Sequence, residues 1–153
     1  MNKKSLLLTL LLVIISIISI YISSEYLSNK KKQLSTDLVT MKVKEDTITS
    51  KSATFTLKSH KKDSLPYIYG EDYYIEKKEN DDWSTLVPII EDFGFNDIGF
   101  TLFGGDEREI EVVWEWLYGD LPIGEYRIVK SIFLDSDIDT VGQNYIEAEF
   151  IIK

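Results

Sequence analysis

The sequence predicts an all-β fold, namely an antiparallel β-sandwich of seven or eight strands that is preceded by one N-terminal hydrophobic helix. Two observations carry this prediction. Short segments in which apolar and polar residues alternate recur from residue 38 to the C-terminus, and turn-forming residues separate them. No amphipathic helical pattern lies between these segments. The chain has 153 residues, so the part after the N-terminal helix is long enough for one domain with a core.

Residues 1–24 are predicted to form a signal anchor, that is, an uncleaved transmembrane helix. Residues 6–22 carry no charge and follow Lys3 and Lys4. At a rise of 1.5 Å per residue this run would span about 26 Å, close to the roughly 30 Å of a hydrocarbon core. A cleaved secretory signal is the alternative, but small residues do not form a clear A-x-A-like cleavage site. The absence of cysteine excludes lipid attachment of the bacterial lipoprotein type.

The orientation follows from the charges around this helix. A short basic start before an apolar run favours a C-terminal domain outside the cell, so we expect a membrane-anchored extracellular domain, or a secreted one if the signal is cleaved. The lysines of residues 30–32 count against this orientation, and a cytoplasmic domain on a reversed anchor is the alternative. Residues 25–36 are polar and are expected to form a stalk.

Charge divides the chain at the same place. Residues 1–32 contain five lysines and Glu25, a net charge of +4, whereas the whole chain carries −9, which leaves −13 for residues 33–153. A domain this acidic repels nucleic acid and anionic lipid, so no nucleic-acid partner is expected. The simplest interpretation of the acidic surface is that it keeps the domain soluble.

The first strands are predicted at residues 38–44 and 52–58, with Glu45 and Asp46 as the break between them. Residues 60–66 form a polar connection to the next strand. The residues expected to face the core are Val39, Met41, Val43, Ala53, Phe55 and Leu57.

The middle of the domain is predicted as a strand over residues 67–76 with a bulge or bend at Gly70. A tight polar turn at 79–82 leads to a short strand at 83–87, which Pro88 ends.

Another strand is predicted at residues 98–103, before Gly104 and Gly105, which are expected to form a two-residue hairpin turn into the strand that begins at Arg108. The last strand covers residues 144–153. Its expected inward residues are Ile146, Ala148, Phe150 and Ile152.

The strand from Arg108 onward is predicted to alternate as far as residue 118, with Val113 and Leu117 as the apolar exceptions on its wet face. A turn at 119–124 follows it, and the next strand opens at Tyr126. The residues assigned to the buried face are Ile110, Val112, Trp114, Trp116 and Tyr118.

The turn contains an L-x-x-G-x-Y pattern formed by Leu121, Gly124 and Tyr126, with Pro122 stiffening the bend. Gly124 is expected to be free to take a positive φ. In immunoglobulin-type sandwiches a tyrosine at this place bonds a backbone group just upstream, an arrangement known as the tyrosine corner. The pattern therefore predicts an immunoglobulin-like sandwich, with ordinary core packing of the tyrosine as the alternative.

The chain resembles the bacterial immunoglobulin-like domain family of exported and membrane proteins of Gram-positive bacteria. The residues that carry the resemblance are V-T-M-K-V-K-E at 39–45, Y-G-E-D-Y-x-I-E-K-K at 69–78 and the W-E-W-L-Y-G block of 114–130. The resemblance covers most of the domain assigned to residues 37–153. It implies a non-catalytic cell-surface protein that serves protein–protein interaction or spacing, with another envelope protein as the expected partner.

Catalytic and metal chemistry finds little support in the sequence. His60 is the only histidine, lies among lysines, and has no nucleophile elbow to serve, so a Ser/His/Asp triad and a zinc site are not expected. Glu91 and Asp92 form the most compact carboxylate pair, but adjacent acids normally point apart or into water, so they do not indicate paired-acid hydrolysis. Residues 94–99 contain glycines but lack the G-K-[ST] ending that a phosphate-binding loop needs. We therefore predict no catalytic, cofactor or metal residues, with an unrecognised hydrolase as a remaining alternative.

A calcium- or carbohydrate-binding surface module is the other alternative. Asp135, Asp137 and Asp139 stand at every second position, as at the start of a calcium loop. The match then fails, because Thr140 stands where glycine is needed and Ile146 where glutamate is needed. An acidic connection between two strands is the simpler interpretation.

Aromatic residues are the better indication of a binding surface. The chain has nine tyrosines and three tryptophans, more than one sheet face can bury. Because neighbours in a strand point to opposite sides, one of Tyr73 and Tyr74 must face away from the core. With Trp83, such residues could anchor a protein or a glycan, although aromatic residues that only cover the two sheets would explain them as well.

Overall fold

The computed structural model describes residues 14–22, 38–62, 65–134 and 144–153, in two compact units, Met1–Leu34 and Ser35–Lys153. In the first unit, residues 14–22 form a helix. No helix within the described ranges combines the length and the apolar character that a membrane span needs. The anchor predicted for residues 1–24 and the stalk for 25–36 fall mostly outside the described residues and stay predictions.

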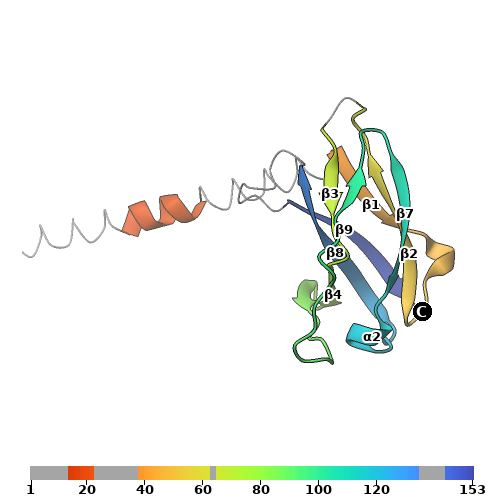
Figure 1. Cartoon of the computed structure of the whole chain (residues 1–153). Helices are drawn as coiled ribbons and strands as arrows, with labels where there is room; N and C mark the ends of the chain where they lie inside the picture. Colours follow the sequence, from red (N-terminus) through yellow and green to blue (C-terminus); the bar gives the residue numbers. More distant parts are fainter. Residues whose placement is uncertain (1–13, 23–37, 63–64, 135–143) are drawn as a thin grey trace, which may run out of the picture. The chain divides into compact units, whose positions relative to one another are not determined.

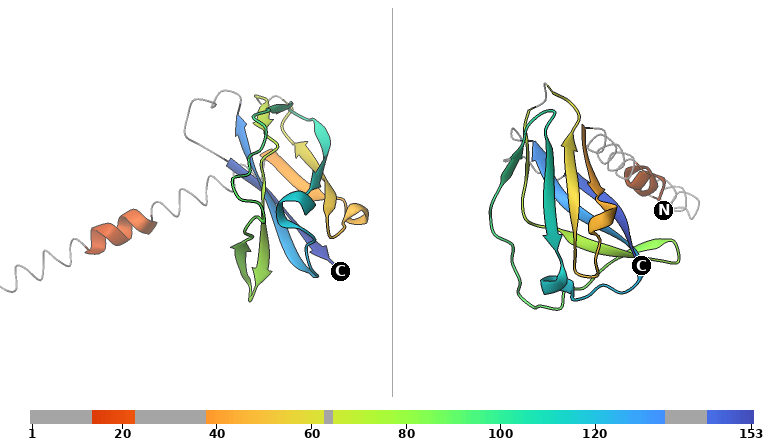
Figure 2. Two further views of the ribbon diagram at one scale, coloured as in Figure 1. Left: turned by 60° about the horizontal axis from the view of Figure 1, so that its bottom comes forward. Right: turned by 90° about the vertical axis from the view of Figure 1, so that its right-hand side faces the viewer.

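The second unit is a sandwich of two antiparallel sheets (Figure 1). The first sheet has the order β1 (Val39–Val43), β2 (Ser52–Ser59), β7 (Glu107–Val113), and a 3-10 helix η1 (Glu45–Thr47) joins β1 to β2. In the right-hand view of Figure 2 this sheet lies in front of the C-terminal strands, which are drawn in blue. The predicted inward positions of the first two strands are confirmed: all are buried apart from Val43, which is half-buried and packs against the core.

The second sheet is organised around the long strand β8, which pairs with β9 along one edge and with β3 and β4 in succession along the other. β5 pairs with β4, and β6 pairs with β3. The described residues therefore form nine strands rather than seven or eight. The bounds in this sheet are β3 Tyr67–Tyr69, β4 Tyr74–Glu79, β5 Asp82–Thr85, β6 Phe100–Leu102, β8 Gly124–Leu134 and β9 Asn144–Ile152.

The bend predicted at Gly70 is confirmed as a bulge that separates β3 from β4. Tyr67 of β3 pairs with Leu134 of β8, and Tyr74 of β4 pairs with Val129 of β8. The chain thus advances seven residues from Tyr67 to Tyr74, while β8 advances only five over the same length of ladder. Two extra residues must therefore leave the ladder, as a bulge requires. Within the bulge the backbone carbonyls of Gly70 and Asp72 accept hydrogen bonds from a side chain and not from a neighbouring strand.

The turn at 79–82 is confirmed as the hairpin between β4 and β5. Asn80 and Asp81 both take positive φ, 51° and 69°. Two consecutive left-handed residues are what a type I′ two-residue turn needs, and asparagine and aspartate tolerate that conformation.

The core between the sheets is built around Phe150 of β9. Its ring stacks on Trp114 at a centroid distance of 5.1 Å and on Tyr126 at 5.7 Å, and it meets the edge of Phe55 at 6.0 Å. These side chains come from both sheets and are almost fully buried, so the aromatic group joins the two layers.

The prediction of a hairpin turn at Gly104 and Gly105 is wrong. β6 pairs with β3 in one sheet and β7 pairs with β2 in the other, so the two glycines carry the chain across the sandwich. A Cβ on Gly104 would lie 2.5 Å from the carbonyl oxygens of Lys61 and Lys62. Glycine is needed there because two backbone segments approach closely, and Gly105 adds a φ of 85°.

The alternation predicted as far as residue 118 is also wrong at its end. β7 stops at Val113, and a single helical turn, α2 (Glu115–Tyr118), follows. Trp114 and Leu117 are both buried because they are three residues apart on this turn, while Trp116 is 41% exposed and Tyr118 is half-buried. Leu117, which broke the strand pattern, was the sign of a helical period.

The tyrosine corner is confirmed. The hydroxyl of Tyr126 donates a 2.8 Å hydrogen bond to the carbonyl oxygen of Pro122. Gly124, however, does not take a positive φ; among the described glycines only Gly105 and Gly119 do. A Cβ on Gly124 would instead lie 3.3 to 3.5 Å from the Tyr126 ring, so glycine leaves room for the tyrosine.

Replacing Tyr126 by phenylalanine should lower the free energy of unfolding by about 1.5 kcal/mol, because the Pro122 carbonyl loses its donor while the ring packing is kept. Urea denaturation followed by tryptophan fluorescence measures this change. Phenylalanine at Tyr145, which is 41% exposed, serves as the control and should lower the midpoint by much less. Equal effects of the two substitutions would show that the corner does not stabilise the fold.

Candidate functional site

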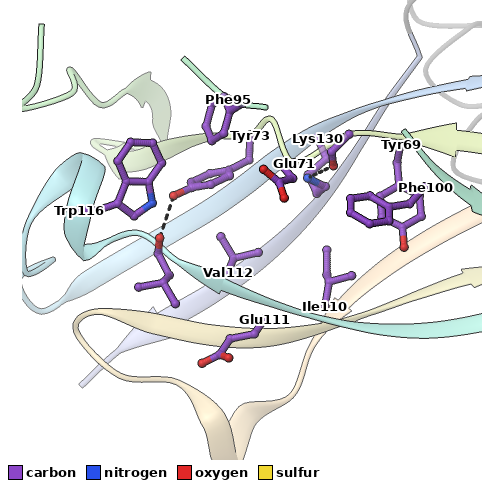
Figure 3. A pocket seen from close by; sticks show the side chains of 12 residues that line it. Tyr69, Glu71, Tyr73, Phe95, Phe100, Ile110, Glu111, Val112, Trp116 and Lys130 are labelled. Carbon is purple, nitrogen blue, oxygen red and sulfur yellow. Dashed lines mark hydrogen bonds between the residues drawn. The ribbon is translucent and has the colours of Figure 1, made fainter. Parts of the chain in front are cut away.

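A pocket of about 420 Å³ opens between the edge of β7 and the bulge that separates β3 from β4 (Figure 3). We call it the edge pocket. Its lining combines aromatic side chains, the end of β7 and charged residues: Tyr69, Gly70, Glu71, Tyr73, Phe95, Phe100, Ile110, Glu111, Val112, Val113, Trp116 and Lys130.

One side of the pocket is the open edge of β7, since this strand ends the order of the first sheet among the described strands. The carbonyl of Asp106 accepts from the N–H of Ser59, and the N–H of Trp114 donates to the carbonyl of Lys51. Even-numbered residues of β7 therefore bond β2, because both backbone groups of a residue point the same way in an antiparallel ladder. The backbone groups that face the open edge belong to Glu107, Glu109, Glu111 and Val113.

Aromatic rings form the opposite walls. Tyr69 stacks on Phe100 with centroids 5.5 Å apart at one end of the pocket. At the other end Phe95 lies 5.2 Å from Tyr73 and 5.7 Å from Trp116. Phe95, from the irregular connection between β5 and β6, is thereby held against the bulge and α2, while Phe100 is held by its strand β6, so that the walls are preformed.

Lys130 forms the polar base of the pocket. Its side chain comes from β8 and is 2% exposed, and its Nζ donates to the carbonyl oxygens of Gly70 at 3.0 Å and Asp72 at 2.8 Å. These are bulge carbonyls that lack a ladder partner, which explains the buried ammonium. Burial lowers the pKa of Lys130 to about 8, and the carboxylates of Asp72 and Glu71 oppose that shift.

The remaining polar groups hold the bulge and one wall in place. The Ser131 hydroxyl donates to the Asp72 carboxylate at 2.5 Å, and the Asn96 amide donates to the Glu71 carboxylate at 2.8 Å. The Tyr73 hydroxyl donates to the carbonyl of Val113 at 3.1 Å, and burial raises its pKa. The polar atoms named here are engaged in these bonds, so the arrangement suits the binding of a largely apolar group more than acid–base chemistry.

The structure separates the aromatic residues that the sequence indicated. Tyr73 is buried in the wall of the edge pocket, whereas its neighbour Tyr74 is half-buried and belongs to the other side of the strand. Trp83 lies away from this pocket, with the Arg127 guanidinium 4.6 Å and the Lys78 Nζ 5.9 Å from its ring. The expectation that one tyrosine faces away from the core is confirmed for Tyr74. Trp83 pairs with Lys78, which lies on the same face of β4 as Tyr74, so these two aromatic residues share the outer side of the sheet and not the edge pocket.

The residues that the sequence offers for other chemistry do not converge where the structure describes them. His60 is exposed and its Nε2 lies 2.8 Å from the Thr40 hydroxyl. Glu91 and Asp92 are exposed in the connection between β5 and β6. Within the described ranges no group of three or more acidic or histidine side chains could hold a metal. The calcium candidates at 135–139 lie outside the described residues, and that alternative stays a prediction.

Sequence reasoning missed Lys130, Phe95, Phe100 and Trp116 as parts of one site. A signal for Lys130 was present, because it occupies the inward phase of β8 together with Tyr126, Ile128 and Ile132. A lysine in that phase has to find buried acceptors. No periodicity could place Phe95, since it belongs to a connection without regular structure.

Comparison with known proteins identifies the domain. A family model described as a bacterial Ig-like domain matches residues 35–150. No curated protein matches the chain. Among solved structures, the crystal structure of a beta-glucosidase from Kluyveromyces marxianus in complex with glucose aligns with 13% identity and a TM-score of 0.34. That alignment covers 75% of this chain and 14% of the beta-glucosidase chain.

Proposed function

Because the chain belongs to the family of bacterial Ig-like domains, we propose that it is a non-catalytic module that recognises another protein of the bacterial envelope or positions it. The partner binds at the edge pocket. The observation that carries this proposal is the juxtaposition of preformed aromatic walls with an open strand edge (Figure 3). Tyrosine, tryptophan and phenylalanine provide much of the binding energy in protein interfaces, and an unpaired edge offers backbone hydrogen bonds.

Apolar side chains around the pocket support recognition rather than spacing alone. Trp116, Phe93 and Phe100 are each about 40% exposed, and Phe93 meets the edge of Trp116 at a centroid distance of 6.4 Å. Ile89 is 65% exposed, and its N–H bonds the carbonyl of Leu117 in α2. A group of exposed apolar residues held by such contacts is typical of an interaction surface.

The proposed location is the outer face of the cell membrane, with residues 1–24 as the anchor and the domain outside. The uncharged run at 6–22 behind two lysines supports this location. Release into the medium follows if the segment is cleaved. Protease added to intact cells tests the orientation: it should degrade the domain, whereas protection of the domain until the cells are lysed would establish a reversed anchor.

Capture from the parent membrane tests the proposed recognition. The full chain should retain a partner, and alanine at Trp116 should abolish that retention, because the substitution removes one wall of the pocket. Trp83→Ala is the matched control, since this half-buried tryptophan lies away from the pocket. A partner lost equally with both variants, or with Trp83→Ala alone, would contradict binding at the edge pocket.

A further inference from the structure

We propose that the edge pocket binds an extended, basic peptide segment, which adds to β7 as a fourth strand and inserts one large apolar side chain between the aromatic walls. This inference rests on the proposed recognition function and specifies the chemistry of the partner at the same site. Main-chain hydrogen bonds would provide affinity, and the pocket would provide specificity, as in other cases of strand addition.

The first argument is the position left open beside β7. In a constant-type immunoglobulin sandwich the first sheet has four strands, and its fourth strand pairs with the strand that corresponds to β7. Here the described strands of that sheet end at β7, because β6 pairs with β3 of the other sheet. The N–H and C=O groups of Glu109 and Glu111 are therefore directed towards a place where a strand would normally lie.

The second argument is the phase of the side chains. Ile110 and Val112 point towards the pocket, while Glu111 points away from it (Figure 3). A strand paired with β7 would alternate in the same way, so every second side chain would enter the space between Phe95, Phe100 and the bulge. A volume of about 420 Å³ accommodates a phenylalanine or leucine side chain together with part of its backbone.

The third argument is charge. Glu107 and Glu109 are neutralised by Lys58 and Lys44, at 2.9 and 2.8 Å, but no described residue forms an ion pair with Glu111. Residues 33–153 carry a net charge of −13, so the surroundings attract a cationic chain. A basic residue at the outward position of an added strand opposite Glu111 would form a cross-strand pair of opposite charges, and such pairs are favourable.

Synthetic heptapeptides provide the test. The probe alternates lysine and threonine around a central phenylalanine, KTKFKTK, with blocked ends and a fluorescent label. Its controls replace the phenylalanine by serine, replace every lysine by glutamate, or methylate every backbone nitrogen. Fluorescence anisotropy with the full 153-residue chain in non-ionic detergent should show that the probe binds at least about tenfold more tightly than each control.

Two variants of the protein locate the binding. Glu111→Pro removes an outward N–H without removing a hydrogen bond to β2, since the neighbouring even-numbered residues make those bonds. Trp116→Ala removes one wall of the pocket and leaves the strand unchanged. Each should weaken binding at least about tenfold, whereas Trp83→Ala should change it less than about twofold.

The proposal is overturned if the four peptides bind equally, if the probe binds undiminished to both pocket variants, or if Trp83→Ala alone abolishes binding. The methylated peptide tests strand pairing even if Glu111→Pro does not fold. The peptide assay and the membrane capture test different claims. If the membrane yields a partner that Trp116→Ala fails to retain, but none of the peptides binds, the recognition function is kept and strand addition is rejected.

Discussion

Replacing Trp114 by alanine should lower the free energy of unfolding by about 4 kcal/mol, far more than the loss of any exposed aromatic side chain. The indole is fully buried, stacks on Phe150 at 5.1 Å, and its Nε1 donates to the carbonyl of Ser50 at 2.8 Å. The substitution leaves a cavity between the two sheets and removes one of the two donors to that carbonyl, which keeps the N–H of Leu121. Denaturant titration monitored by circular dichroism measures the loss.

Trp116→Ala is the matched control for this experiment, because the same residue type stands two positions later. Trp116 is 41% exposed on α2, so its loss should cost less than about 1 kcal/mol. A strand that continued to residue 118 would place both tryptophans on the same buried face. Equal destabilisation by the two substitutions would therefore contradict the helical turn α2.

The second large effect is a dependence of stability on pH that arises from Lys130. The folded state releases the Lys130 proton near the lowered pKa of about 8, whereas the unfolded chain holds it up to the ordinary lysine value of 10.5. Between these values the unfolded state binds more protons, so the free energy of unfolding rises with pH. From pH 7 to pH 9.5 this residue alone should contribute about 2 kcal/mol of added stability.

Lys130→Met removes the titrating group and should abolish this rise. The comparison is made below pH 10, because burial raises the pKa of tyrosines such as Tyr73 and Tyr126, whose ionisation in the unfolded chain then lowers stability. Urea midpoints at half-unit steps of pH give the result for both proteins. Parallel profiles for the wild type and Lys130→Met would show that the buried ammonium does not titrate in this window.

Much of the fold was predictable because single strands follow a local rule. The alternation in β2 and β9 places Ala53, Phe55, Ile146 and Phe150 in the core without knowledge of any partner strand. The tyrosine corner was predictable for a similar reason, since the carbonyl that Tyr126 bonds is only four residues upstream.

The features that were missed depend on partners far along the chain. Whether Gly104 turns within one sheet or crosses to the other depends on the close approach of Lys61, and no local pattern contains that information. The edge pocket combines Phe95 of an irregular connection with Lys130 of β8 and the end of β7. Its existence also requires an open edge at β7, which is a property of the sheet order and not of any single segment.

The central claim is that partners bind at the edge pocket. Photo-crosslinking in living cells tests it most directly, with benzoylphenylalanine introduced at Trp116 in one strain and at Trp83 in another. We expect a crosslinked protein from position 116 and none from position 83, because Trp116 lines the pocket and Trp83 packs against Arg127 away from it. A crosslink from position 83 alone, or from neither position, would contradict the claim.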